Sequence, residues 1–172
     1  MKKFVLLGYM GCGKSTIANM LSKNADIPFV DLDKKIEEKL NLSINEIFEA
    51  HGEIYFRKLE HETFVELLDS PENLIIGLGG GTPCYANNHE LFKGDGVVSV
   101  YLKASIETLF GRLAVNKSKR PLIAAQSEDE LKEFIAKHLF DRSFYYNQAK
   151  YKVIVDGRTI DQTVQDIMDI LA

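Results

Sequence analysis

Short apolar runs recur along the chain, and longer segments with helical spacing separate them. The runs with the character of strands lie at residues 4–7, 29–31, 74–78, 97–102 and 151–155. Most of them are continuously apolar, as expected for parallel strands that are buried on both faces. The pattern therefore predicts a sheet of parallel strands.

Polar signatures of helix starts lie between these runs. Capping boxes, in which side-chain and backbone groups at a helix start satisfy one another, occur at residues 43–46, 127–130 and 159–162. Ser105 is a further N-cap candidate. Apolar residues recur at helical spacing between residues 43 and 70, and we expect Gly52 to divide this segment into two helices.

The elements follow one another in the order βαβααβαβαβα. This alternation predicts a doubly wound α/β fold, a three-layer sandwich with helices on both faces of the sheet. We expect one domain that spans residues 1–172. Ligands bind at the carboxyl ends of the strands in such sheets, so the loops that follow the strands are the candidate site.

Composition narrows the classes of partner. The formal net charge is −4, so the chain lacks an overall basic surface for nucleic acid. Its apolar runs are too short to predict a membrane span. Cys12 and Cys84 form neither a metal-type pair nor a disulfide framework. We therefore expect a cytoplasmic protein with no nucleic-acid or membrane partner. Separately from composition, we expect the protein to be a monomer.

The segment from Gly8 to Thr16 fits the phosphate-binding pattern G-x-x-x-x-G-K-[ST] and lies between a predicted strand and a predicted helix. Backbone N–H groups of such a loop point at phosphates, where the helix dipole favours negative charge. Lys14 would pair the β- and γ-phosphates of ATP, and Ser15 would coordinate Mg²⁺. The alternative is a glycine-rich turn that binds nothing. The predicted nucleotide-binding residues here are Gly11, Cys12, Gly13, Lys14, Ser15 and Thr16.

Two carboxylates follow the second strand, at Asp31 and Asp33. If the strand continues, both point the same way and reach the rim of the sheet. One can then hold the water shell of the metal, and the other can accept a hydroxyl proton. The alternative is that Asp33 only caps a helix at residues 34–40.

The third strand is followed by Gly79, Gly80 and Gly81. Three successive glycines indicate backbone that approaches a ligand with no side chain between, although a tight turn is the simpler alternative.

A basic stretch at residues 112–125 contains Arg112 and Arg120 and no acidic residue. It is typical of a lid that closes over phosphate, or else it is a solvated loop.

The sequence pattern alone does not assign a role to two further arginines. Arg57 has Glu53 and Glu60 at helical spacing, so an ion pair on a solvated helix face explains it without any ligand. Arg142 falls near the end of a predicted helix, where it could complement the helix dipole.

Taken together, these motifs resemble the shikimate kinase family, and the resemblance covers essentially the whole chain. No single motif is specific, but their order and spacing are. The matching segments are Gly8–Thr16, Asp31–Asp33, Gly52-Glu53 with Phe56, Arg57 and Glu60, Gly79–Gly81, Arg120-Pro121-Leu122, and Arg142 with Tyr146. The chain departs from the family pattern at Phe144-Tyr145.

The resemblance implies a P-loop kinase of the nucleoside-monophosphate-kinase type, with strand order 2-3-1-4-5. It implies transfer of the ATP γ-phosphoryl group to the 3-hydroxyl of shikimate, a step of chorismate and aromatic amino acid biosynthesis. The implied catalytic residues are Lys14, Asp33 and Arg120, with Mg²⁺ held by Ser15 and Asp31. The implied shikimate ligands are Asp33, Arg57, Arg142 and Gly79, Gly80 and Gly81, and Arg112 lies towards the adenine. A shikimate-binding subregion at 33–61 and a lid at 112–125 follow.

Three rival interpretations are open at this point. The first is another small-metabolite P-loop kinase, such as a gluconate or nucleoside kinase. The second is a nucleotide-dependent switch, but Asn116-Lys117-Ser118-Lys119 lacks the aspartate that guanine recognition needs. The third is an inactive relative, which the intact set of Lys14, Ser15, Asp33 and Arg120 disfavours.

Overall fold

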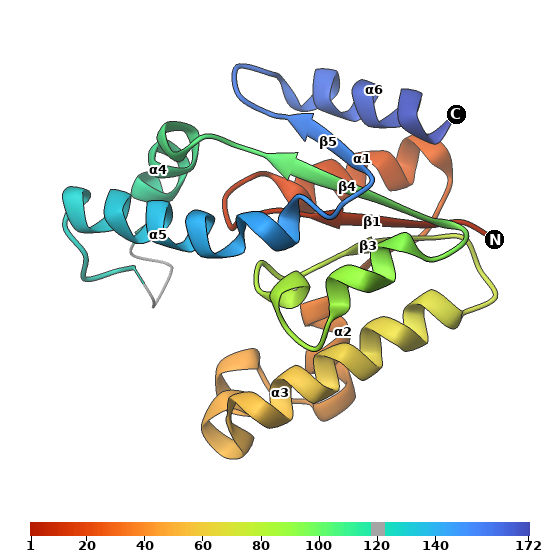
Figure 1. Cartoon of the computed structure of the whole chain (residues 1–172), viewed down its shortest axis with the longest axis horizontal. Helices are drawn as coiled ribbons and strands as arrows, with labels where there is room; N and C mark the ends of the chain where they lie inside the picture. Colours follow the sequence, from red (N-terminus) through yellow and green to blue (C-terminus); the bar gives the residue numbers. More distant parts are fainter. Residues whose placement is uncertain (118–122) are drawn as a thin grey trace.

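Five strands form one parallel sheet in the part of the chain that the computed structural model describes, residues 1–117 and 123–172 (Figure 1). Their order is β2-β3-β1-β4-β5, which confirms the predicted topology. Val5 of the central strand pairs in register with Ile76 on one side and Ser99 on the other. The strands are β1 Lys3–Leu7, β2 Phe29–Asp31, β3 Leu74–Gly77, β4 Val97–Lys103 and β5 Tyr151–Ile154.

Burial of the strands follows their place in the sheet. Every residue of β1 and β3 is buried, as continuous apolar runs predict for inner strands. The edge strand β5 differs, because Tyr151 and Ile154 at its ends are exposed. An edge strand has a neighbour on one side only, so part of its surface meets solvent.

The helices begin largely where the capping signals place them. All three capping boxes form, and the Ser105 side chain caps its helix as predicted. Gly52 has φ of 82° and breaks the long third helix, as expected. The described helices are α1 Lys14–Ala25, α2 Leu32–Leu40, α3 Ile44–Asp69, α4 Ile106–Val115, α5 Glu128–Tyr146 and α6 Ile160–Leu171, with 3-10 helices η1 Thr82–Cys84 and η2 Asn88–Lys93.

The predicted element order is wrong in two connections. Between β3 and β4 the chain forms the two 3-10 helices instead of an α-helix. Ala86 and Asn87 take left-handed backbone conformations there, and these interrupt any regular helix. Between β4 and β5 the predicted order has one helix, but the chain forms two, α4 and α5, which begin at the two helix starts predicted at Ser105 and Ser127.

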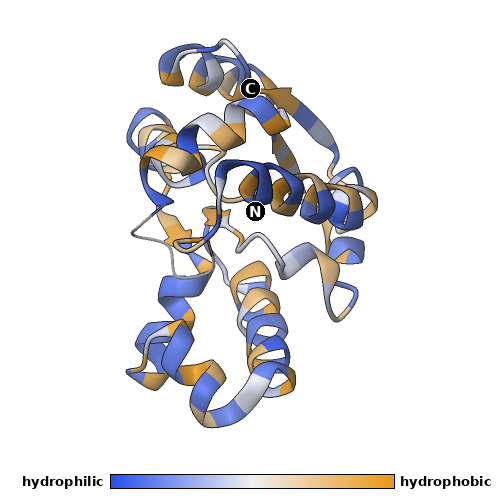
Figure 2. Ribbon diagram, turned by 90° about the vertical axis from the view of Figure 1, so that its left-hand side faces the viewer, coloured by the Kyte–Doolittle hydropathy of each residue, from blue (hydrophilic) through white to orange (hydrophobic). Residues whose placement is uncertain are grey.

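Helices cover both faces of the sheet, as predicted. α1 packs against α6 on one side, while α5 and the 3-10 helices lie across the other, and α2 with α3 extends away from the sheet below it (Figure 1). The strands and the inward stripes of the helices are apolar, and the outward stripes are hydrophilic (Figure 2). The layers therefore leave the carboxyl ends of the strands to be covered by loops.

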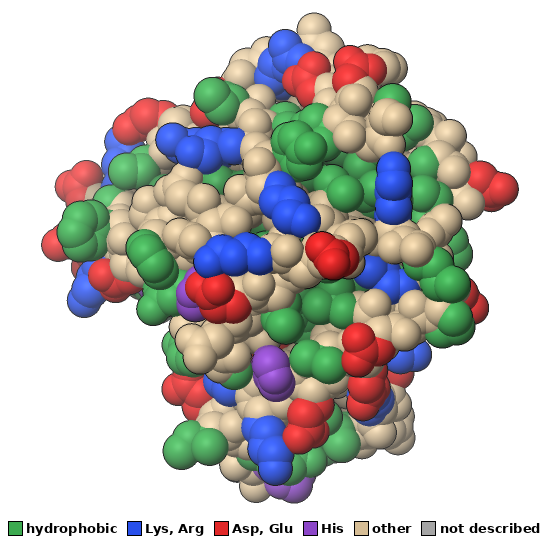
Figure 3. All heavy atoms as spheres, turned by 45° about the vertical axis from the view of Figure 1, so that its right-hand side comes forward, with side chains coloured by type: hydrophobic (Ala, Val, Ile, Leu, Met, Phe, Trp, Pro, Cys, Tyr) green, Lys and Arg blue, Asp and Glu red, His purple; other side chains and the backbone are tan. Residues whose placement is uncertain are grey.

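Acidic and basic side chains are interspersed on the face of the molecule shown in Figure 3. Several Lys and Arg side chains lie near the middle of this face although the chain carries a net charge of −4. Among the described helices, none is long and apolar enough to cross a membrane.

Candidate active site

The glycine-rich loop turns from β1 into α1 at the carboxyl end of the sheet. Gly11 and Gly13 have φ of 85° and 93°, conformations that favour glycine, so the turn requires the second glycine of the pattern, Gly13, and a further glycine at position 11. Gly13 is the N-cap of α1 and has no side chain to occupy the helix start. The first turn of α1 therefore presents its backbone N–H groups and positive dipole end to any bound anion.

Basic side chains surround this loop. The Lys14 ammonium donates a hydrogen bond to the Gly8 carbonyl at 3.1 Å, so it lies back over the loop. Arg112, from α4, donates to the Gly11 carbonyl at 3.1 Å. A cleft of about 680 Å³ opens above them. It is lined by the loop residues 9–16, by Asp31 and Asp33, by residues 78–80, and by Arg112, Asn116 and Ile160.

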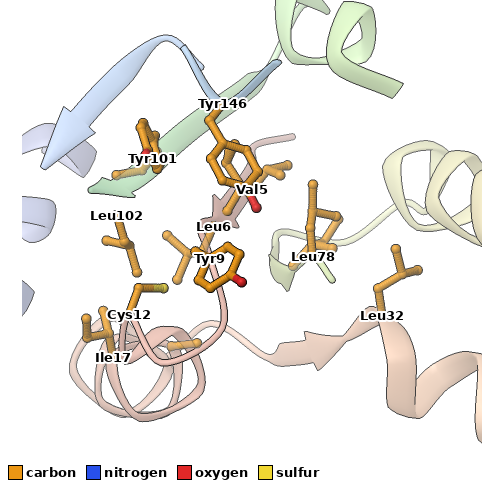
Figure 4. Close-up of a cluster of buried hydrophobic side chains, with 14 of the residues drawn as sticks. Val5, Leu6, Tyr9, Cys12, Ile17, Leu32, Leu78, Tyr101, Leu102 and Tyr146 are labelled. Carbon is orange, nitrogen blue, oxygen red and sulfur yellow. The ribbon is translucent and has the colours of Figure 1, made fainter. Parts of the chain in front are cut away.

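Cys12 contributes to this cleft mainly through its position in the loop. Its side chain is buried among apolar and aromatic groups, including Leu102, Ile17 and Tyr9 (Figure 4). A β-carbon built on Gly8 would lie 2.8 Å from the Cys12 sulfur, so the thiol fills the space that the glycine leaves. The Cys12 N–H donates to the Tyr9 carbonyl at 3.1 Å within the loop.

The two aspartates reach the cleft by different routes. The premise of a continuing strand is wrong, because β2 ends at Asp31 and α2 starts at Leu32. The proposed cap is also reassigned: Asp31, not Asp33, caps α2, and its carboxylate accepts from the Lys34 N–H at 3.1 Å. Asp33 lies in the first turn of α2 and is free of the capping role. Both carboxylates line the cleft.

Electrostatics set Asp33 apart. Burial, reinforced by the nearby carboxylates of Glu60 and Asp31, raises the pKa of Asp33 to about 6, although Lys14 opposes the shift. A carboxylate with a pKa near neutrality is suited to accept a proton from a substrate hydroxyl.

The three consecutive glycines each face a different functional side chain. A β-carbon built on Gly79 would lie 3.0 Å from Asp33 Oδ1, and one on Gly80 would lie 3.0 Å from an Arg142 nitrogen. One on Gly81 would lie 3.0 Å from both terminal nitrogens of Arg57. The turn thus brings one carboxylate and two guanidinium groups from distant segments around the same stretch of backbone.

Arg57 forms ion pairs with Glu53 and Glu60, the two acidic residues that its spacing on the helix predicts. Its Nη1 lies 3.0 Å from Glu60 Oε1, and its Nε lies 3.6 Å from Glu53 Oε1. Glu53 is exposed, but the other side of the pair is not solvated, because Glu60 is buried and also accepts from the Thr82 hydroxyl at 2.7 Å. The ion pair with Glu60 therefore holds Arg57 at the glycine turn, where it can meet a ligand, and does not leave it on a solvated helix surface.

Arg142 does not serve the helix dipole alone. It is half-buried, with its guanidinium carbon 5.6 Å from the Tyr9 ring centroid. Tyr146, one turn further along α5, is fully buried and donates its hydroxyl to the Gly80 carbonyl at 2.6 Å. This contact places Tyr146 despite the departure from the family pattern at Phe144-Tyr145.

Magnesium is the metal whose chemistry fits these residues. Within the described residues, no group of three or more His, Cys, Asp or Glu side chains could hold a metal ion. Mg²⁺ needs no such cluster, because it binds through one or two protein oxygens together with substrate phosphates and water. Ser15 and Asp31 line a common hollow of about 300 Å³ beside the glycine-rich loop and supply such oxygens.

The predicted lid is only partly described. Arg120 lies outside the described residues. Arg112 belongs to α4, so the first residues of the predicted lid are helical instead of forming a loop. Ile123, beyond the gap, is buried in the core.

Sequence reasoning missed several residues that shape the site. Tyr9 pairs through its hydroxyl with His138 Nδ1 at 2.9 Å, and Thr82 anchors Glu60. Glu60 and Tyr146 stand among the family-like residues but were not assigned a role, although the spacing of four between Arg142 and Tyr146 puts both on one helix face. Tyr85, which stacks on Arg57, carries no sequence signal.

Comparison with known proteins gives consistent results over the full length of the chain. The family model described as Shikimate kinase matches residues 10–172. A shikimate kinase of Flavobacterium johnsoniae is 75% identical over 172 residues, which are 100% of each chain. The crystal structure of shikimate kinase from Bacteroides thetaiotaomicron matches with a TM-score of 0.90 and 34% identity, covering 99% of this chain and 98% of that one. The shikimate kinase of Acinetobacter baumannii, solved in complex with shikimate, matches with a TM-score of 0.85 and 30% identity over 99% and 93% of the two chains.

Proposed function

This chain belongs to the shikimate kinase family, and we infer that it transfers the γ-phosphoryl group of ATP to the 3-hydroxyl of shikimate. The products are shikimate 3-phosphate and ADP, in a step of chorismate and aromatic amino acid biosynthesis. The observation that carries the assignment of residues is the glycine turn, where Asp33, Arg142 and Arg57 each lie against one glycine.

The nucleotide side of the reaction falls to the glycine-rich loop. Lys14 neutralises charge on the β- and γ-phosphates, and the first turn of α1 donates N–H groups to them. Arg112 extends this positive surface from α4 towards the adenine. Its hydrogen bond to the Gly11 carbonyl and its place in the cleft support this role.

The acceptor side is formed by the glycine turn and its three charged neighbours. Arg57 and Arg142 together bind the shikimate carboxylate, because a planar guanidinium matches a carboxylate with two parallel hydrogen bonds. Asp33 binds the ring hydroxyls and accepts the proton of the attacking 3-hydroxyl. Its position between Lys14 and Gly79 supports this role, since the hydroxyl must meet the γ-phosphate there.

Ser15 and Asp31 would hold Mg²⁺ with the help of ATP phosphates. Held there, the ion would supply positive charge against the charge that develops on the phosphates. Arg120 would supply further positive charge to the transferring group from the lid at residues 112–125. We also propose that residues 33–61 form the shikimate-binding subregion and that the protein acts as a cytoplasmic monomer.

Release of ADP from Mg-ATP tests this function directly. The rate is measured with shikimate and, in parallel, with gluconate and with nucleoside monophosphates. We expect strong stimulation by shikimate alone. Stimulation by gluconate or a nucleotide instead would show that the acceptor is another small metabolite, and no stimulation with intact Mg-ATP binding would show that the acceptor site has been misassigned.

A further inference from the structure

We propose that Tyr85 is a positioning residue for shikimate binding, which holds the guanidinium of Arg57 in the orientation that receives the substrate carboxylate. The inference rests on the proposed role of Arg57 and adds to it a residue outside the matched motifs.

The stacking geometry is close. The guanidinium carbon of Arg57 lies 3.8 Å from the centroid of the Tyr85 ring. Gly81 approaches the same group so closely that a β-carbon there would lie 3.3 Å from that carbon. The guanidinium therefore has an aromatic ring and a bare backbone segment against it, and both restrict its rotation.

The contacts of Arg57 leave part of its edge for a ligand. Glu60 takes Nη1, at 3.0 Å. Nε faces the Glu53 carboxylate at 3.6 Å without a hydrogen bond within the described residues, and Nη2 has no hydrogen-bond partner among them. A ring stacked on the flat face consumes none of the in-plane N–H donors, so Tyr85 can fix the group without competing for them.

The backbone that carries Tyr85 is built to hold it there. Ala86 and Asn87 follow with φ of 51° and 55°, a left-handed turn that side chains disfavour. Asn88 secures the turn: its N–H donates to the Tyr85 carbonyl at 3.0 Å, and its side chain donates to the Thr82 carbonyl at 2.9 Å. Strained backbone that is so firmly over-determined points to a role for the residue it presents.

The segment that carries Tyr85 is also connected to Arg57 through Thr82 and Glu60. The Thr82 hydroxyl donates to Glu60 Oε2 at 2.7 Å, while Glu60 Oε1 holds Arg57. Tyr85 and Arg57 also line a common surface hollow of about 570 Å³ together with Ile54, Lys58 and His61. Loss of the ring would remove the stacking contact and free the guanidinium to move.

The test compares Tyr85→Ala and Tyr85→Leu with Tyr85→Phe. Leucine keeps apolar bulk but has no aromatic face, and phenylalanine keeps the face without the hydroxyl. We expect alanine and leucine to raise the KM for shikimate, and its Kd by calorimetry without ATP, about 3- to 30-fold. The KM for ATP and kcat stay within about twofold, and phenylalanine restores shikimate binding.

Tyr151→Ala is the control. Tyr151 is 44% exposed, similar to Tyr85 at 39%, but it begins the edge strand β5 outside the proposed shikimate-binding subregion. We expect this variant to bind shikimate as the parent protein does. An equal loss in Tyr151→Ala, or a loss in Tyr85→Phe as large as in Tyr85→Ala, would overturn the inference.

A double-mutant cycle with Arg57→Ala separates the inference from the proposed function. Once Arg57 is absent, Tyr85→Ala should add no further loss. If Arg57→Ala leaves shikimate binding unchanged, the proposed role of Arg57 fails and the inference fails with it. If Arg57→Ala weakens binding but Tyr85→Ala does not, or if the two losses multiply in the double variant, only the inference on Tyr85 is overturned.

Discussion

The hydroxyl of Tyr146 donates a hydrogen bond to the carbonyl of Gly80 at 2.6 Å, which ties the end of α5 to the glycine turn. The two residues are far apart in the chain but meet at the point where Arg142 approaches the same glycine. The contact thus couples the helix that carries Arg142, one of the two arginines proposed to bind shikimate, to the turn that carries the other contacts of the proposed site.

Tyr146→Phe tests this coupling. Without the hydroxyl, the Gly80 carbonyl loses its partner, so we expect the free energy of unfolding to fall by about 1–2 kcal/mol in urea titrations. The KM for shikimate should rise about 2- to 10-fold while the KM for ATP stays unchanged. Tyr101→Phe is the control, because its ring packs 5.1 Å from that of Tyr146 but does not reach the turn. An unchanged shikimate KM in Tyr146→Phe would reduce the contact to a structural one.

Protonation of Asp33 should govern the acid limb of activity. Its pKa is raised to about 6, chiefly by burial and then by Glu60 and Asp31. The carboxylate must be ionised to accept the hydroxyl proton, so kcat/KM for shikimate should rise with pH up to about 6 and then level. Rate profiles from pH 5 to 8 measure this, and an acid limb well below pH 5 would contradict it.

The same shift predicts a pH dependence of stability. Because the folded state binds the Asp33 proton more tightly than the unfolded state, the stabilising effect is complete below about pH 4 and is lost as pH rises through about 6. The Asp33→Asn variant has no carboxylate to ionise and so does not lose this stability. Between pH 4 and pH 7, the difference in free energy of unfolding between this variant and the parent protein should therefore shift in favour of the variant by on the order of 2–3 kcal/mol. Urea titrations at the two pH values measure the difference, and parallel curves would show that Asp33 ionises normally.

Asp31 combines two roles that different substitutions separate. Its carboxylate caps α2 through the Lys34 N–H and is also a candidate ligand of Mg²⁺. Asp31→Asn keeps a good cap, so stability should hold while activity requires more Mg²⁺. Asp31→Ala should lose the metal effect and also about 1 kcal/mol of stability. Activity measured against MgCl₂, beside urea unfolding, distinguishes the two, and an unchanged Mg²⁺ requirement in both variants would leave Asp31 as a cap alone.

The fold was predictable from the sequence where local signals and burial agree. The apolar inner strands and the capping boxes at Ser43, Ser127 and Thr159 formed as expected. The connection after β3 was not predictable, because its 3-10 helices depend on left-handed turns at Ala86 and Asn87, which are not glycines.

The site was predictable in its residues but not in its arrangement. Arg57 and its two acids looked like an exposed helix pair, because sequence spacing does not reveal that Glu60 is buried under Thr82. Tyr85 could not be found at all, since its contact with Arg57 joins segments that no local pattern relates. Capping by Asp31 in place of Asp33 turned on where α2 begins, at Leu32 instead of residue 34, which is a shift of two residues at a helix end.

Arg120 stays a prediction from the sequence. If it neutralises charge on the transferring phosphoryl group, Arg120→Ala should lower kcat about 100-fold or more while the KM for ATP changes modestly. Lys119→Ala serves as a charge-matched neighbour and should retain most of the activity. Near-normal turnover of Arg120→Ala would remove the arginine from the mechanism.

Gly79 should be sensitive to the smallest side chain, for a reason particular to its neighbours. A β-carbon there would lie 3.0 Å from Asp33 Oδ1 and 3.1 Å from the Thr82 hydroxyl, so both groups must shift by a few tenths of an ångström. Such a shift moves the proposed base relative to the 3-hydroxyl, and we expect Gly79→Ala to lower kcat about 10-fold.

Gly111→Ala is the control for a glycine that has no such neighbour. A β-carbon at Gly111 would meet nothing within 4 Å in the described residues, and the residue lies inside α4. Alanine there should raise the free energy of unfolding by about 0.5–1 kcal/mol, because glycine is the poorer helix former, and should leave kcat unchanged. Steady-state kinetics measure kcat of both variants, and urea titrations measure their free energies of unfolding. If Gly79→Ala turns over shikimate as fast as Gly111→Ala does, Asp33 has enough room to adjust, and the close approach of the turn to its carboxylate is not what sets the rate.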